Sequence, residues 1–240
     1  MAGRLYVGTS GFAYPDWAPR FYPAGLAASG LLNHYAGRLP AVELNNTYYA
    51  SPSASKVEAW LAATPPDFRF AVKTQRGGSF RALGVDPTTA VPWLTGPYRA
   101  FGDRLGTVLF RVPDGVRRDD GKLGAMLAEW PADLPLTMEL RDPSWHADET
   151  FAALAAAGAA LCATDLPDED PPTLRRTGSF LYVRLRRHDY DPGEIEAWAA
   201  RLEPFLAGGD DVFVFFRHDE VGRGAELAMA LDEAVGRLRS

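Results

Sequence analysis

The sequence predicts an α/β fold, a single TIM-type (β/α)8 barrel over residues 1–240 that is slightly irregular around its sixth unit. The chain has 240 residues, which gives each of eight strand–helix units about thirty residues, the size of a minimal barrel. Eight short apolar runs recur along the chain, and each ends in polar, charged or aromatic residues. Runs such as TVLF and FVFF are apolar on both faces, as parallel strands buried between a core and helices require.

Each predicted strand is a short apolar run followed by a polar cluster. In chain order these runs cover residues 5–8, 41–45, 69–74, 107–112, 136–140, 160–164, 180–185 and 212–216. Alternating strands and helices would also fit a doubly wound open sheet, which usually has a G-x-G-x-x-G phosphate turn after its first strand. The segment GTSGFAYPDW lacks such a turn, so the barrel is preferred.

Helices are predicted between most strands from apolar residues that recur on one face. They cover about 29–37, 54–63, 98–105 and 123–130, an alanine-rich stretch ending near 157, and about 195–205 and 227–238. Two segments depart from this pattern. Residues 75–95 are predicted to form a long, glycine-containing excursion that serves as a lid or partner surface. Residues 165–173, DLPDEDPPT, are predicted to replace a regular sixth helix with a turn-rich connection.

Composition and charge exclude some classes of protein. With 47% apolar and 23% charged residues, the chain is typical of a globular protein and not of a disordered or fibrous one. Its net charge of −6 argues against a general nucleic-acid coat but permits a local basic pocket. No leader and no run of roughly 18 apolar residues is evident, so a cytoplasmic protein without a membrane partner is predicted. The only cysteine, Cys162, is predicted to be a core residue.

The polar clusters at the strand ends are the candidate site, because barrel enzymes keep their chemistry at the carboxyl ends of their strands. Glu43, Glu139 and Lys73 are the candidate catalytic residues, two carboxylates for proton transfer and an amine as electrophile or proton donor. The surrounding polar and aromatic residues are candidate ligand-binding groups: Asn45, Thr47, Tyr48, Tyr49, Arg111, Arg141, Trp145, Asp165, Arg184, Arg186, Arg217 and His218.

Cationic groups outnumber acids at these strand ends although the whole chain is acidic. Guanidinium groups suit phosphate and carboxylate oxygens, so a small anionic ligand is predicted. A structural alternative is that Glu43, Glu139, Lys73 and Arg184 form a paired network that fills the polar end of the barrel. No cofactor is predicted. Two weaker alternatives are a divalent metal on Glu43, Glu139 and Asp165, which the arginines disfavour, and a glycosidase that uses the two glutamates.

Several stretches together are typical of one family: VGTSGFAYPDW with FYP, VELNNTYY, TPPDFRFAVK, LGTVLFRVP, MELRDPSW and YVRL, and more loosely DVFVFFRHDEVGRGAELA. In these stretches the chain resembles the domain of unknown function 72 family, also called YecE-like, whose members are TIM-type barrels sometimes described as sugar-isomerase related. The resemblance covers nearly all of the chain. It implies the barrel fold and a shared pocket at the strand ends, without an established activity.

The chain differs from the usual pattern of this family in ways that add positive charge. Arg111 stands where family members commonly have glutamine, and Arg186 and Arg187 stand where they have histidine and glycine. Arg217 and His218 occupy a place where paired asparagines are common. The resemblance therefore implies that the ligand, or its affinity, differs here from the rest of the family.

Three functions are compatible with this sequence. The first is an enzyme, an isomerase, lyase or hydrolase, that acts on a small phosphorylated or carboxylated, sugar-like substrate. The second is nucleic-acid binding or processing, with Tyr48, Tyr49 and Trp145 stacking on bases. The third is a non-catalytic scaffold that binds a ligand without changing it. The sequence does not predict an oligomeric state.

Overall fold

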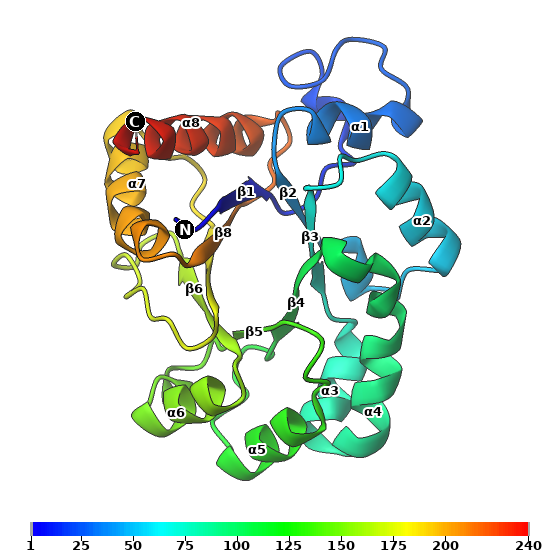
Figure 1. Ribbon diagram of the computed structural model, residues 1–240, viewed down its shortest axis with the longest axis vertical. Helices are drawn as coiled ribbons and strands as arrows, with labels where there is room; N and C mark the ends of the chain where they lie inside the picture. The colour runs from blue at the N-terminus through cyan, green and yellow to red at the C-terminus, as the bar shows by residue number, and fades with distance from the viewer. Residues whose placement is uncertain (1, 240) are drawn as a thin grey trace.

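Figure 1 shows the computed structural model, which describes residues 2–239 as a ring of strands surrounded by helices. The strands in this part of the chain are β1 (Leu5–Thr9), β2 (Ala41–Leu44), β3 (Arg69–Lys73), β4 (Leu105–Arg111), β5 (Leu136–Glu139), β6 (Ala160–Asp165), β7 (Phe180–Leu185) and β8 (Asp211–Phe216). They pair in parallel in the order β1-β8-β7-β6-β5-β4-β3-β2. The predicted TIM-type barrel is confirmed.

The outer layer consists of helices that follow most of the strands. They are α1 (Leu31–Ala36), α2 (Ala54–Ala62), α3 (Arg76–Gly84), α4 (Pro87–Thr95), α5 (Asp120–Glu129), α6 (Asp148–Ala156), α7 (Pro192–Ala207) and α8 (Arg223–Leu238). The connection between β6 and β7, residues 166–179, contains no helix, so the predicted irregularity of the sixth unit is confirmed. No helix within residues 2–239 has the length and apolar character needed to cross a membrane.

Residues 75–95, predicted as a long, glycine-containing excursion, are largely helical. They form α3 and α4, which pack on each other and on α5. The side chains of Gln75 and Asp86 accept backbone hydrogen bonds from the first turns of these helices and cap them. Glycine in α3 and proline in α4 weakened the helical signal of this segment. The helix predicted over 98–105 is a 3-10 segment, Gly96–Arg104.

The ring closes between β1 and β2 without a regular ladder. Gly8 lets the two strands approach, since a Cβ there would lie 1.9 Å from the carbonyl oxygen of Ala41. The buried hydroxyl of Tyr35 spans the gap: it accepts a hydrogen bond from the Thr9 N–H at 2.8 Å and donates one to the Ala41 oxygen at 3.0 Å. A phenol from α1 thus makes hydrogen bonds that a neighbouring strand makes elsewhere in the ring.

Replacing Tyr35 by phenylalanine is expected to destabilise the protein by about 1–3 kcal/mol, because a buried N–H and a buried carbonyl lose their partner. Urea unfolding of the variant and the wild type measures this difference. Tyr49→Phe is the matched control: its side chain is 81% exposed, and we expect a change below about 0.5 kcal/mol. A loss in Tyr35→Phe no larger than the control's would show that the closure does not depend on the hydroxyl.

The inside of the barrel has an apolar layer and a charged layer. The apolar layer lies toward the amino ends of the strands, where the Tyr6 and Phe213 rings stack with centroids 4.8 Å apart. Cys162 is buried in this layer, as predicted. Because side chains alternate between the axis and the helices, the next inward positions along the strands form the charged layer above it.

Candidate functional site

Four strands bring charged side chains to the carboxyl-terminal mouth of the barrel. Glu43, Lys73, Glu139 and Arg184 each follow an inward-facing residue by two positions, so the period of the strand turns them toward the axis. All four are buried. Burying a charge is costly unless the charge is paired. The contacts of each of these four side chains therefore show which of them has hydrogen-bonding capacity left for a ligand.

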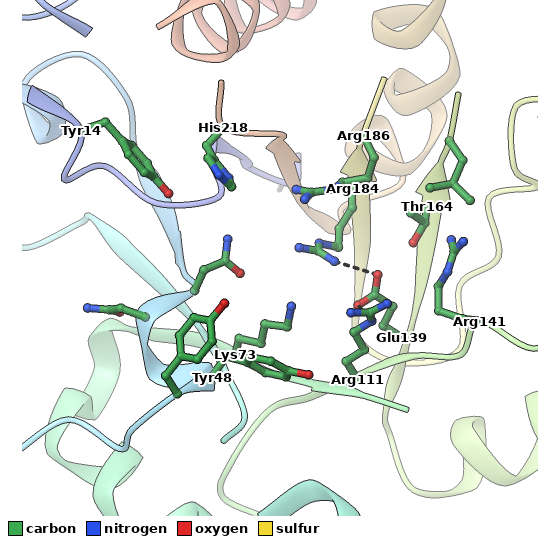
Figure 2. Close-up of a pocket in the computed structure, with 14 residues that line it drawn as sticks. Tyr14, Tyr48, Lys73, Arg111, Glu139, Arg141, Thr164, Arg184, Arg186 and His218 are labelled. Atoms are coloured by element: carbon green, nitrogen blue, oxygen red, sulfur yellow. Dashed lines mark hydrogen bonds and ion pairs between the residues drawn. The ribbon is translucent and has the colours of Figure 1, made fainter. Parts of the chain in front are cut away.

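Arg184 bridges the two glutamates. Its Nη2 donates to Glu43 Oε1 at 2.8 Å, and its Nη1 donates to Glu139 Oε1 at 2.7 Å, the contact drawn as a dashed line in Figure 2. Burial alone would raise the pKa of Glu139, but Arg184 and Arg111 lower it below its ordinary value. The sequence suggested a paired network of four buried charges. Glu43, Glu139 and Arg184 form such a network in the structure, and Lys73 lies beside it.

The carboxylate of Glu43 is fully engaged. Besides Arg184, it accepts hydrogen bonds from Ser10 Oγ at 2.7 Å and from the Tyr182 hydroxyl at 2.8 Å. Burial alone would raise the pKa of Glu43, but the surrounding cations, led by Arg184, lower it to about 2. Glu43 does not line the cavity described below. Glu43 thus lies below the cavity, where its contacts anchor the base of the site, and its predicted catalytic role stays a prediction.

Acid is expected to destabilise the protein through Glu43. Its pKa in the folded protein is lowered from 4.5 to about 2 by Arg184, Arg186 and Lys73. A lowered pKa contributes stability above pH 4.5, and this contribution, about 3 kcal/mol, is lost as the pH falls toward 2. Urea unfolding of wild type and Glu43→Gln across this range measures it, since only the wild type should show this loss. Parallel stability profiles for the two proteins would contradict the assignment.

A cavity of about 550 Å³ opens above the charged layer. Figure 2 shows its lining side chains pointing inward from the strand ends and the loops that follow them. They are Tyr14, Asn45, Asn46, Tyr48, Tyr49, Lys73, Arg111, Glu139, Arg141, Thr164, Leu166, Arg184, Arg186 and His218. Five of these side chains are lysine or arginine and one is a carboxylate. The lining thus carries more positive than negative groups, although Arg184 is paired below the cavity and Asp114 lies 2.9 Å from Arg111 Nη2 and 3.8 Å from Arg141 Nε.

Lys73 points into this cavity from the end of β3 (Figure 2). Its Nζ lies 4.7 Å from the centre of the Tyr48 ring, and no carboxylate within residues 2–239 forms an ion pair with it. Burial, and after it the neighbouring Arg184, lower the pKa of Lys73 to about 8. This amine is therefore held close to its titration point at neutral pH.

The opposite side of the cavity holds Arg186 and His218. The Nη1 of Arg186 donates to Ser10 Oγ at 2.8 Å. Burial, and after it Arg184, lower the pKa of Arg186 to about 10, so the guanidinium stays charged at neutral pH. His218 stacks on Tyr14 with ring centres 5.0 Å apart, and burial followed by Arg186 lowers the pKa of His218. This side thus offers one fixed positive charge and a neutral imidazole.

Two acceptor oxygens in the cavity lining have no hydrogen-bond donor among residues 2–239. They are Asn45 Oδ1 and Glu139 Oε2, and both are buried. Glu139 Oε2 forms an ion pair with Arg111, whose Nε is 3.5 Å away, but this distance is too long for a good hydrogen bond. An unpaired buried acceptor is costly, so both oxygens are suited to receive hydrogen bonds from a ligand.

Ten of the residues predicted from the sequence line this cavity. They are Asn45, Tyr48, Tyr49, Lys73, Arg111, Glu139, Arg141, Arg184, Arg186 and His218. The other lining residues are Tyr14 and Asn46, which lie in segments whose aromatic and amide groups the sequence already indicated, and Thr164 and Leu166, which it did not. Thr164 had a usable signal, because it follows the core residue Cys162 by two positions and therefore faces the same way.

Two predicted ligand-binding residues, Thr47 and Trp145, do not line this cavity and make structural contacts. The hydroxyl of Thr47 donates to the backbone oxygens of Leu44 and Lys73 at 2.7 and 2.6 Å and joins two strand ends. Trp145 is buried, and its indole N–H donates to the Val116 oxygen at 2.7 Å. Trp145 thus packs outside the ring and does not line the cavity.

Asp165 and Arg217 also lie outside the cavity lining. Asp165 is buried and is held by Arg187 Nε at 3.0 Å and by the Tyr190 hydroxyl at 2.7 Å. Arg217 contacts His188 at the surface, with 3.1 Å between Nη1 and Nδ1. Within residues 2–239, no group of three or more His, Cys, Asp or Glu side chains is placed to hold a metal ion. The weaker metal alternative thus lacks an assembled ligand set there.

Comparisons with known proteins place this chain in a family. The family profile described as "protein of unknown function DUF72" matches residues 6–240. The UPF0759 protein YunF of Bacillus subtilis is 24% identical over 262 residues, which cover 92% of this chain and 91% of that protein.

Solved structures give the same result. A DUF72 family protein from Thermotoga maritima is 26% identical, with a TM-score of 0.84 over 99% of this chain and 100% of that chain. A DUF72 family protein from Enterococcus faecalis is 19% identical and shares the fold, with a TM-score of 0.79 over 97% and 95% of the two chains. The resemblance noted in the sequence is thus confirmed, and this chain belongs to the DUF72 family of proteins of unknown function.

Proposed function

We propose that the protein is an enzyme that acts on a small, hydroxylated anion of the phosphorylated or carboxylated, sugar-like class. The observation on which this rests is the charge of the cavity, in which five cationic side chains face one carboxylate. Like charges packed together repel each other, and an anion offsets that repulsion. Guanidinium forks also match the oxygens of phosphate and carboxylate groups, so such an anion has both charge and geometry in its favour.

The hydroxyl part of the substrate follows from the unpaired acceptors. A fully deprotonated inorganic anion such as sulfate has no donor for Asn45 Oδ1 or Glu139 Oε2, which are buried in the cavity lining without one. Sugar hydroxyls donate hydrogen bonds, and aromatic rings such as Tyr14 and Tyr48 offer faces for the C–H side of a sugar. A sugar-like anion therefore pairs with more of the polar groups in the cavity lining than an anion without hydroxyl groups does.

The cavity also contains groups suited to proton transfer. Glu139 is ionised at neutral pH and its Oε2 accepts no hydrogen bond among residues 2–239, so it is the candidate general base. Lys73 is the candidate proton donor or electrophile on the facing side, and Arg111, Arg141 and Arg186 are the candidate anion clamp. Arg184 fixes the position of Glu139. This arrangement suits an isomerase, lyase or hydrolase whose chemistry begins by moving a proton.

Thermal unfolding in the presence of ligands tests the proposal. A ligand at a hundred times its dissociation constant adds about 2.7 kcal/mol, which raises the midpoint of a chain of this size by about 5–11 °C. We expect such a shift with sugar phosphates or sugar acids, and no shift with the uncharged sugars. A shift with short single-stranded DNA that disappears at high salt would instead favour nucleic-acid binding. A bound sugar anion that is never converted would favour a non-catalytic scaffold.

Arg141→Met is expected to weaken binding of the anion by about 10–100-fold, because a hydrogen bond to a charged group is worth about 1.5–3 kcal/mol. Isothermal titration with the ligand found by the thermal screen measures the change. Arg176→Met is the matched control, since Arg176 forms an exposed ion pair with Asp210 and does not line the cavity. Equal affinities for the two variants would remove Arg141 from the anion clamp.

A further inference from the structure

Lysine is rare in this chain, and one lysine lies in the cavity. Only three of the 25 lysine and arginine residues are lysines: Lys56, Lys73 and Lys122. Lys56 and Lys122 are exposed, the first over the ring of Trp60 and the second beside Asp119. Lys73 is buried and reaches the cavity. Its environment is thus unlike that of the other two.

Lysine and arginine differ in the chemistry that they offer. A guanidinium keeps its proton in proteins, whereas an ammonium can lose one and become a neutral, nucleophilic amine. Of the five cations that line the cavity within residues 2–239, four are therefore fixed charges and only Lys73 is a potential amine nucleophile. An arginine at position 73 would serve as well for binding an anion, so the amine offers something beyond charge.

Burial, and after it the neighbouring cations, lower the pKa of Lys73 and so increase the share of neutral amine. Four charged groups face it: Arg184 and Arg111 disfavour its positive charge, while Glu43 and Glu139 favour it. Both glutamates accept hydrogen bonds from Arg184, and neither forms an ion pair with Lys73. A desolvated lysine next to another cation is a recognised way to activate an amine. With its pKa lowered to about 8, about one amine in ten is neutral at pH 7.

On the basis of the function proposed above, we propose that Lys73 forms an imine with a carbonyl group of the anionic substrate. The substrate class is then an oxo acid or a keto sugar phosphate. The arginines of the cavity hold its anionic group, and Nζ, unpaired and facing the cavity, attacks its carbonyl carbon.

The steps balance without an oxidant or a reductant. The ammonium of Lys73 loses one proton to solvent, and the neutral amine adds to the carbonyl carbon. A C–N bond forms, and the carbonyl oxygen becomes the hydroxyl of a carbinolamine after taking a second proton from nitrogen. A proton from solvent enters on that hydroxyl, which leaves as water and yields the iminium ion. The iminium draws electrons from the adjacent C–H bond, whose proton Glu139 is placed to accept.

Reductive trapping tests this proposal on the full chain. Glyoxylate, pyruvate and dihydroxyacetone phosphate are the carbonyl probes, and glycolate, lactate and glycerol phosphate are their matched anions without a carbonyl. Each probe is incubated with the protein, sodium borohydride is added, and intact mass with peptide mapping locates the reduced adduct. Lys56 and Lys122 are references within the same sample. Lys73→Arg keeps the charge without the amine, and Lys73→Met is a second variant in case the larger guanidinium does not fit.

We expect one adduct per chain at Lys73 with at least one carbonyl probe. It should exceed labelling at the other two lysines by at least about tenfold, because binding raises the local concentration of the carbonyl. The adduct should be absent from both Lys73 variants, unchanged in Lys56→Arg and Lys122→Arg, and more abundant as the pH rises through about 8. Equal labelling of all three lysines would overturn the proposal.

The matched anions separate this inference from the function on which it rests. If the carbonyl probes and their matched anions both raise the unfolding midpoint but no adduct forms at Lys73, the imine is wrong and the anion site stands. If no anion raises the midpoint and no adduct forms, both proposals are wrong.

Discussion

Replacing Arg184 by methionine is expected to lower the free energy of unfolding by about 3–5 kcal/mol, since breaking a buried ion pair leaves an uncompensated charge. Here one substitution removes the partner of two carboxylates, Glu43 and Glu139, which are 0% and 3% exposed. Urea unfolding measures the loss. Arg99→Met is the control, because the Arg99–Asp133 pair is exposed and such pairs contribute about 0–1 kcal/mol.

A compensating variant distinguishes lost charge balance from lost packing. If the cost of Arg184→Met comes from the two unpaired carboxylates, then adding Glu43→Gln and Glu139→Gln should recover part of it, because neutral amides are cheaper to bury. The three substitutions would therefore be non-additive, as residues that share one network are. Additive losses, or a single-variant loss below about 1 kcal/mol, would show that Arg184 does not hold the network together.

Glu139→Gln is expected to lower kcat by about 100–10,000-fold, the range over which general acid–base groups act. The amide oxygen can still accept the hydrogen bond from Arg184, so the fold and the ligand-induced rise in unfolding midpoint should persist. Turnover of the ligand found by the thermal screen is the measurement, with kcat and KM determined separately. Glu149→Gln is the matched control: the same chemical change at an exposed carboxylate of α6, paired with Arg118, should leave kcat unaltered.

A fall in binding without a fall in kcat would give Glu139 a positioning role instead. The pH profile adds a second readout, because the pKa of Glu139 is lowered by Arg184 and Arg111 in spite of its burial. If Glu139 is the base, wild-type turnover should show a fall below the ordinary pKa of glutamate as the carboxylate is protonated, separate from the fall near pH 8 that protonation of Lys73 would cause.

The strands and most of the cavity lining could be predicted from local pattern. A strand that is buried on both faces can be recognised from a short run of apolar residues. Because successive side chains of a strand point to opposite faces, the positions of Lys73 and Arg184 in their runs indicate that both side chains face the barrel axis. The two helices α3 and α4 could not be predicted in the same way, because glycine and proline within them weaken the signal on which a helix assignment depends.

The roles of individual residues depended on contacts between distant parts of the chain. Glu43 has the residue type and location of a catalytic base, yet Ser10 and Tyr182, which occupy its oxygens, are 33 and 139 residues away. Trp145 follows the end of a strand, where an aromatic ring could stack on a ligand. Its indole N–H instead donates to the carbonyl of Val116, 29 residues away, and holds the ring in a buried position. Local sequence indicates which groups reach the mouth of the barrel, but it does not indicate which of them are already paired.

The closure between β1 and β2 has a consequence for motion. Within residues 2–239 it is the one junction of the ring without a ladder, so thermal opening of the barrel should concentrate there, and amide hydrogen exchange at Thr9 would report it. Ser10, immediately beyond β1, contacts both Glu43 and Arg186, so each opening also loosens one arginine of the anion clamp. The rate at which this junction opens and the rate at which the cavity binds its ligand should therefore be coupled.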